Sequence, residues 1–160
     1  MLQPSTLTYI TNLTNNNNKP WFEENRFAFN EAKEDFEKLV KNIIAKFGEI
    51  DPDIAPLEAK NCIFRQYRDV RFSKDKTPYK QHMGASFDRG GKKSGFAGYY
   101  LHIQPGNKSM AGGGIWMPEG EQLKKRSARK LIIAGMSSAE LLTTKSLKAF
   151  TTILNKANLS

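Results

Sequence analysis

The chain has 160 residues and a formal net charge of +9, with 26% charged and 39% hydrophobic residues. This length can bury a core without metals or disulfides, and the composition excludes a chain that is disordered throughout. No apolar run approaches the ~18 residues of a membrane-spanning helix, and the N-terminal residues do not form a secretory signal. The single cysteine, Cys62, excludes an internal disulfide, so we expect a reducing compartment, the cytoplasm, and no membrane partner.

The charges are distributed unevenly along the chain. Residues 1–60 hold 7 basic and 10 acidic side chains, a net charge of −3. Residues 61–100 and residues 101–160 each hold 9 basic and 3 acidic side chains, a net charge of +6 in each segment. A dense basic block attracts phosphates, nucleic acid or anionic surfaces. The middle segment is therefore where we look for a site.

The N-terminal third has the pattern of helices. Residues 5–14 repeat apolar side chains at helical spacing, with Ser5 or Thr6 as a cap, and the run Asn15–Asn18 should break this helix. A long helix is predicted from Pro20 to Gly48. Its apolar stripe comprises Phe22, Phe29, Phe36, Leu39, Val40, Ile43, Ile44 and Phe47.

The apolar period changes after a loop predicted at residues 49–60. Alternation from residue 61 predicts a short strand, followed by strands at 83–89, 96–104 and 109–116. Short connections between neighbouring strands imply an antiparallel sheet.

The predicted fold is α+β, with N-terminal helices packed on the antiparallel sheet and short C-terminal helices after it. We expect one domain over residues 1–160. It comprises a helical layer at 1–48, a sheet with the basic block at 61–117, and a helical tail at 118–160.

The chemistry is concentrated in residues 65–80. This block contains three arginines, three lysines and two aspartates, interleaved with aromatic residues. Arginine forms bidentate bonds to phosphate or carboxylate, whereas lysine acts as a point charge. Asp69 and Asp75 can neutralise at most two of the six positive charges. The surplus favours a pocket for a phosphorylated or carboxylated small molecule, with ligand contacts from Arg65, Arg68, Asp69, Arg71, Lys76, Tyr79 and Lys80.

In this pocket Asp69 would orient the arginines and Tyr79 would cover the ligand. An enzyme built on it would use His82 or Tyr79 as the proton donor. Two alternatives stay open. The block is a nucleic-acid-binding module in one, with Tyr67 or Phe72 stacking on bases. In the other it is a salt-bridge network that has only a structural role.

The remaining signals favour structural roles. His82 and His102 are the only histidines, and their spacing does not predict a metal site; no cofactor is expected either. The segment Gly90–Gly95 lacks the glycine spacing of a phosphate-binding loop and reads as a hairpin turn. Cys62 is expected to be a buried apolar residue rather than a nucleophile.

The basic block also carries a family resemblance. The pattern Arg65-x-x-Arg68-Asp69-x-Arg71-Phe72, followed by Asp75-Lys76-x-x-Tyr79-Lys80, resembles the signature of a family of conserved hypothetical proteins of bacteria and some fungi, catalogued as a domain of unknown function. Similar segments occur at residues 18–22, 98–103 and 112–118. The resemblance implies an α+β domain and supplies no activity. It covers about residues 5–125; beyond them we expect a departure from the family, through truncation or a frame shift.

Overall fold

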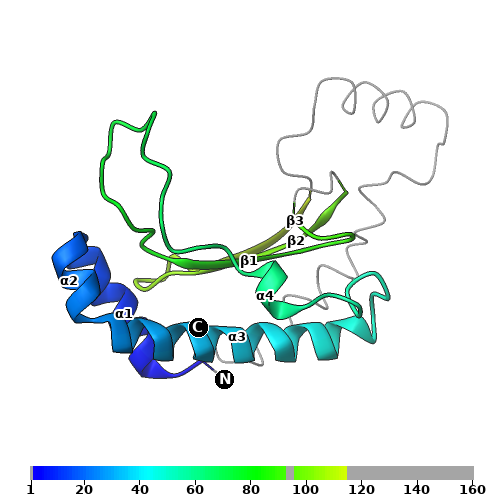
Figure 1. Cartoon of the computed structure of the whole chain (residues 1–160). Helices are drawn as coiled ribbons and strands as arrows, with labels where there is room; N and C mark the ends of the chain where they lie inside the picture. Colours follow the sequence, from blue (N-terminus) through cyan, green and yellow to red (C-terminus); the bar gives the residue numbers. More distant parts are fainter. Residues whose placement is uncertain (1, 93–95, 115–160) are drawn as a thin grey trace.

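A three-stranded antiparallel sheet lies against a layer of helices in the computed structural model, which describes residues 2–92 and 96–114. The strands follow the order β1-β2-β3, and the helices lie on one face of the sheet (Figure 1). The α+β prediction is confirmed; the predicted C-terminal helices lie outside the described residues. The elements are α1 (Pro4–Asn15), α2 (Lys19–Glu24), α3 (Arg26–Gly48), α4 (Ala59–Cys62), β1 (Met83–Asp88), β2 (Gly98–Ile103) and β3 (Met110–Gly114).

Helix α1 forms where it was predicted, but its N-terminal cap differs. The N-cap is Gln3, followed by Pro4, and no side chain caps the helix. Proline suits this position because the first helical N–H groups have no intrahelical partner. The Thr6 hydroxyl instead donates a hydrogen bond to the Asp35 carboxylate at 2.7 Å, and this bond joins α1 to α3. The prediction that Ser5 or Thr6 caps the helix is therefore wrong.

The predicted long helix is two helices that meet at Asn25. The side-chain amide of Asn25 donates to the Trp21 carbonyl at 2.9 Å, and its backbone is not helical, with φ −100° and ψ 23°. Asparagine competes with the backbone for such hydrogen bonds and so favours helix ends. Helix α2 has its own cap, because the Asn18 side chain accepts from the Trp21 N–H at 3.0 Å.

The apolar stripe of α3 packs on one face of the sheet, which we call the near face. Phe36, Val40, Ile43 and Phe47 are at most 1% exposed. The Phe47 ring meets the Tyr99 ring of β2 edge-on, with centroids 4.7 Å apart. Alternate residues of the strands supply the rest of the near face: Met83, Ala85 and Phe87 of β1, and Tyr99, Leu101 and Ile103 of β2.

The predicted strand at residue 61 does not form as such. Helix α4 includes residues 59–62, and the chain then pairs with other segments only at two isolated bridges, Ile63 with Ala85 and Tyr67 with Tyr79. The alternation of side chains persists without a continuous ladder of hydrogen bonds. The segment thus runs beside β1 before the chain projects into a loop at residues 69–77.

Among the helices of the described ranges, none has both the length and the apolarity to cross a membrane.

The contact between α3 and the sheet predicts a large effect of Phe47→Ala. This substitution removes a fully buried ring and should lower the free energy of unfolding by about 3–5 kcal/mol. The matched control is Phe27→Ala, because Phe27 is 75% exposed on the same helix and should change stability by less than about 0.5 kcal/mol. Urea titration measures both, and equal losses would contradict this packing.

Candidate functional site

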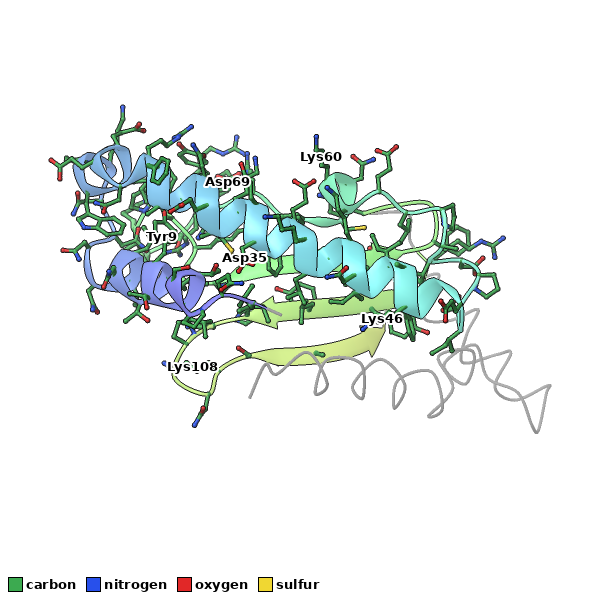
Figure 2. All side chains as sticks on the ribbon, turned by 90° about the horizontal axis from the view of Figure 1, so that it is seen from below. Tyr9, Asp35, Lys46, Lys60, Asp69 and Lys108 are labelled. Carbon is green, nitrogen blue, oxygen red and sulfur yellow. The ribbon has the colours of Figure 1, made fainter. Side chains whose placement is uncertain are left out.

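The sheet face opposite α3, which we call the far face, gathers the polar side chains of the strands. The register pairs Gly84 with His102 and Ser86 with Tyr100. Because side chains alternate between the two faces of a strand, these residues point away from the buried near face. Figure 2 is seen from the helical side and shows α3 in front of the strands, so α3 covers the near face. The far-face residues Ser86, Asp88, Tyr100 and His102 are half-buried by the described part of the chain, whereas Gly84 is buried.

Two histidines stack on the far face. The rings of His82 and His102 have centroids 4.0 Å apart and an interplanar angle of 25°. His102 is fixed on both sides, since Nδ1 lies 3.3 Å from the Tyr100 hydroxyl and Nε2 lies 2.9 Å from the Gln104 amide oxygen. Burial, His102 and Lys80 together lower the pKa of His82 to about 4. His82 is therefore neutral at neutral pH.

Lys80 lies close enough to His82 to act on it electrostatically, and Arg65 and Lys92 act on Lys80 in the same way. We call these three cations, Arg65, Lys80 and Lys92, the cationic cluster. The ammonium groups of Lys80 and Lys92 each lie 5.3 Å from the centroid of the Phe64 ring. Burial, Arg65 and Lys92 lower the pKa of Lys80. None of the ion pairs in the described ranges includes a member of the cluster. The cluster therefore concentrates positive charge that no ion pair within these ranges neutralises, although Arg65 is, after Arg71, one of the groups that lower the pKa of Asp69.

A carboxylate also occupies the far face. Asp88 accepts a hydrogen bond from the Ser86 hydroxyl at 2.6 Å. Burial raises the pKa of Asp88, and the Ser86 hydrogen bond opposes this increase. The carboxylate lies directly against Gly98, where an added Cβ would come within 1.9 Å of it. Glycine at 98 thus lets the two strands approach beside this carboxylate. Perturbed pKa values at Lys80, His82 and Asp88 mark this face as a candidate site.

The loop at residues 69–77 is tied together by Arg68. Its guanidinium pairs with the Asp75 carboxylate at 2.5 Å and also donates to the Thr77 hydroxyl. The backbone N–H of Thr77, then Arg68, then the Thr77 hydroxyl lower the pKa of Asp75 to about 2. Arg68 therefore serves the structure of the loop.

A second ion pair lies at the exposed side of this loop. Arg71 binds Asp69 in a bidentate arrangement, with N–O distances of 2.9 Å and 2.6 Å. Asp69 therefore holds one arginine in place. Its predicted role of orienting the arginines toward a ligand stays a prediction. Lys76 donates to the backbone carbonyl of Val70 at 3.0 Å. The predicted ligand contacts thus separate: Arg68, Asp69, Arg71 and Lys76 hold the loop, while Arg65 and Lys80 join the cationic cluster.

Tyr79 has a different position from the one predicted for a ligand contact. Its side chain is 1% exposed, and its ring stacks on Phe22 at 4.0 Å and 10°. Its backbone is held by Asn17, whose side chain both donates to and accepts from Tyr79. Burial is the main cause that raises the pKa of Tyr79. We leave Tyr79 out of the ligand contacts and out of proton transfer, because it is closed off within the aromatic core.

Sequence reasoning missed Lys92, a member of the cationic cluster, and Phe64, the ring beside Lys80 and Lys92. Lys92 lies in the glycine-rich turn after β1, and its ammonium group donates to the Ile63 carbonyl at 2.6 Å. No spacing in the sequence connects it to Lys80. For Tyr100 and His102 the sequence does carry a signal, because the predicted strand at 96–104 puts residues two positions apart on the same face. Cys62 is buried as predicted, and burial is the main cause that raises its pKa to about 11.

The far face and the basic loop define an α+β protein with a positively charged candidate site, and comparison with known proteins gives its family. The chain belongs to the family described as "Conserved hypothetical protein (DUF2461)", whose model matches residues 5–159. The match continues past residue 125, so the expectation that the family resemblance ends there is wrong. Comparison with curated proteins found no match, and comparison with solved structures found none either.

The ion pairs of the loop predict unequal effects of two arginine substitutions. Arg68→Ala leaves Asp75 and Thr77 without their common partner and should lower the melting temperature by about 2–4 °C. Arg71→Ala should have a smaller effect, because the Arg71 side chain is 76% exposed and solvent screens its ion pair. Differential scanning fluorimetry compares the two variants. Equal melting temperatures would show that Arg68 does not hold the loop.

The half-buried position of His82 predicts that stability depends on pH. The pKa of this side chain is about 4 in the folded chain against an ordinary value of 6.5. Between these values the unfolded chain binds a proton that the folded chain does not, so stability falls as the pH decreases from 6.5 toward 4.

His82→Gln should remove this contribution. Between about pH 7 and pH 5, the free energy of unfolding of the wild type should fall by about 2 kcal/mol more than that of the variant. Urea unfolding of both proteins at the two pH values gives the difference, in which other titrating groups cancel. Identical losses in the two proteins would contradict a half-buried His82 that stays neutral in the folded chain.

Proposed function

We propose that this protein binds a phosphorylated or carboxylated small molecule on the far face of its sheet. The anionic group of the ligand contacts the cationic cluster of Arg65, Lys80 and Lys92. Phe64 lies beside Lys80 and Lys92, and its ring meets that of Tyr100 edge-on, with centroids 6.1 Å apart. The ligand body packs against these two aromatic rings, which form the apolar wall of the site.

The observation that carries the proposal is that Lys80 and Lys92 crowd one ring, with each ammonium group 5.3 Å from the Phe64 centroid. The lowered pKa of Lys80 agrees with this crowding. Burial lowers it first, and Arg65 and Lys92 lower it further. Like charges held together in a partly desolvated place are unfavourable unless an opposite charge compensates them. A phosphate or carboxylate supplies that charge. Arg65 can bind it in a bidentate manner while the lysines add point charges.

The histidine pair extends this site toward acid–base chemistry. Lys80 is one of the groups that lower the pKa of His82. A bound anion offsets the charge of Lys80 and so raises the pKa of His82 toward the range in which an imidazole exchanges protons at neutral pH. In an enzyme built on this site, His82 transfers the proton to or from the bound ligand. This role agrees with the sequence-based choice of His82 and does not need Tyr79.

Substitution of the cluster tests the proposal. The wild-type chain should be stabilised by one or more members of a panel of inorganic phosphate, sugar phosphates, nucleotides and small carboxylates. A ligand at about 100 times its dissociation constant adds roughly 2.7 kcal/mol, which raises the melting temperature. Arg65→Gln combined with Lys80→Gln should abolish this stabilisation.

The control is Lys33→Gln combined with Lys38→Gln, which removes the same charge from exposed positions of α3. This variant should respond to the ligand as the wild type does. If no member of the panel stabilises the wild type, or if both double variants lose the response equally, the cationic cluster is not the binding site.

A further inference from the structure

The loop at residues 69–77 presents an isolated aromatic ring to solvent. Figure 1 shows this part of the chain standing away from the sheet and the helices, in green above α2. Phe72, near its tip, is 96% exposed. A phenylalanine at this exposure makes almost no contribution to the core, because burial of apolar surface is the source of its stabilisation.

The loop that carries Phe72 is held in one shape by its own side chains. Arg68 ties Asp75 and Thr77 together, and Asp69 fixes Arg71. The ammonium group of Lys76 closes the loop onto the Val70 carbonyl at 3.0 Å. Ordering a flexible loop on binding costs conformational entropy, and a preformed loop avoids most of that cost. Phe72 is therefore displayed on a preorganised support.

The charges around Phe72 are suited to an anionic partner. Asp69 and Asp75, the carboxylates of the loop, are both engaged in ion pairs, whereas Lys74 is exposed and forms none with the described residues. The Arg71 guanidinium lies 5.8 Å from the centroid of the Phe72 ring. Asp69 occupies two of its five N–H groups. The other three remain available to an oxyanion beside the exposed ring.

From this arrangement we propose that the loop binds single-stranded nucleic acid. A base stacks on Phe72, while Arg71 and Lys74 contact the flanking phosphates. Aromatic rings beside cations are the common means of binding single strands, because every base has a face that can stack. This inference does not rest on the anion site of the far face, since neither Phe72 nor Arg71 belongs to the cationic cluster.

Two other partners fit the loop less well. Insertion into a bilayer needs more apolar surface than the single exposed ring of Phe72 between Arg71 and Lys74 provides. A stable protein interface buries about 800 Å² on each partner. A projecting loop of nine residues, 69–77, supplies little of that area by itself. A nucleic-acid strand needs only the ring and its neighbouring cations.

Fluorescence anisotropy with a labelled single-stranded oligonucleotide of about 12 nucleotides tests the inference on the full chain. The wild type should bind, and affinity should fall steeply between roughly 50 and 200 mM salt. Phe72→Ala should weaken binding about 5- to 150-fold, which corresponds to one stacked base. Phe72→Trp should retain it, because the indole ring still stacks.

The matched control is Phe27→Ala, since Phe27 is also an exposed phenylalanine, at 75%, but belongs to α3. This variant should bind the oligonucleotide as the wild type does. The inference is overturned if the wild type does not bind the oligonucleotide or if Phe72→Ala binds it with unchanged affinity. It is also overturned if Phe27→Ala loses as much affinity as Phe72→Ala does. Binding of the wild type to anionic phosphatidylserine vesicles but not to the oligonucleotide would assign the loop to a membrane surface instead. The Arg65→Gln, Lys80→Gln variant separates the two proposals. If it loses phosphate binding but still binds the oligonucleotide, the far-face site and the loop act independently.

Discussion

The packing of α3 against one face of a three-stranded sheet determines which strand residues lie on the side of the candidate site. A strand directs successive side chains to opposite faces. When the side chains at every second position are buried against α3, those at the positions between them must lie on the far face. Tyr99, Leu101 and Ile103 lie on the helical side, each at most 2% exposed. Tyr100 and His102 are therefore directed to the far face, where His102 stacks on His82 and Tyr100 meets the ring of Phe64.

The basic residues of the block at residues 65–80 serve two different purposes. Arg68 and Arg71 are neutralised by Asp75 and Asp69, and their ion pairs shape the projecting loop. The cationic cluster has no such partner in the described part of the chain. This division explains how one basic block can satisfy both the structural and the ligand-binding interpretation of the sequence. The first applies to the loop, and the second is our proposal for the residues that flank it.

Much of the fold could be predicted because its signals are periodic and local. The β1–β2 hairpin and the apolar stripe of α3 follow directly from repeats of two and of three to four residues. The break at Asn25 was missed because apolar residues continue at helical spacing on both sides of it, while one side-chain hydrogen bond to Trp21 ends the helix. The strand at residue 61 was predicted wrongly because alternation reports which face a side chain takes and not whether the backbone is paired.

The candidate site was less accessible to sequence reasoning, because it depends on residues that only the fold brings together. Lys92 and Lys80 reach the ring of Phe64 from separate turns of the chain. Tyr79, by contrast, was placed with the ligand contacts because it belongs to the basic block in sequence. Its ring instead stacks on Phe22, which lies far from Tyr79 along the chain.

The most direct measurement is the pKa of Lys80, followed by NMR of the lysine side chain with and without inorganic phosphate. Our account predicts a pKa below the ordinary value of 10.5 in the free protein and an increase when phosphate occupies the cationic cluster. A pKa at the ordinary value that phosphate does not change would mean that the three cations are neither crowded nor compensated by a ligand, and the proposed anion site would have to be abandoned.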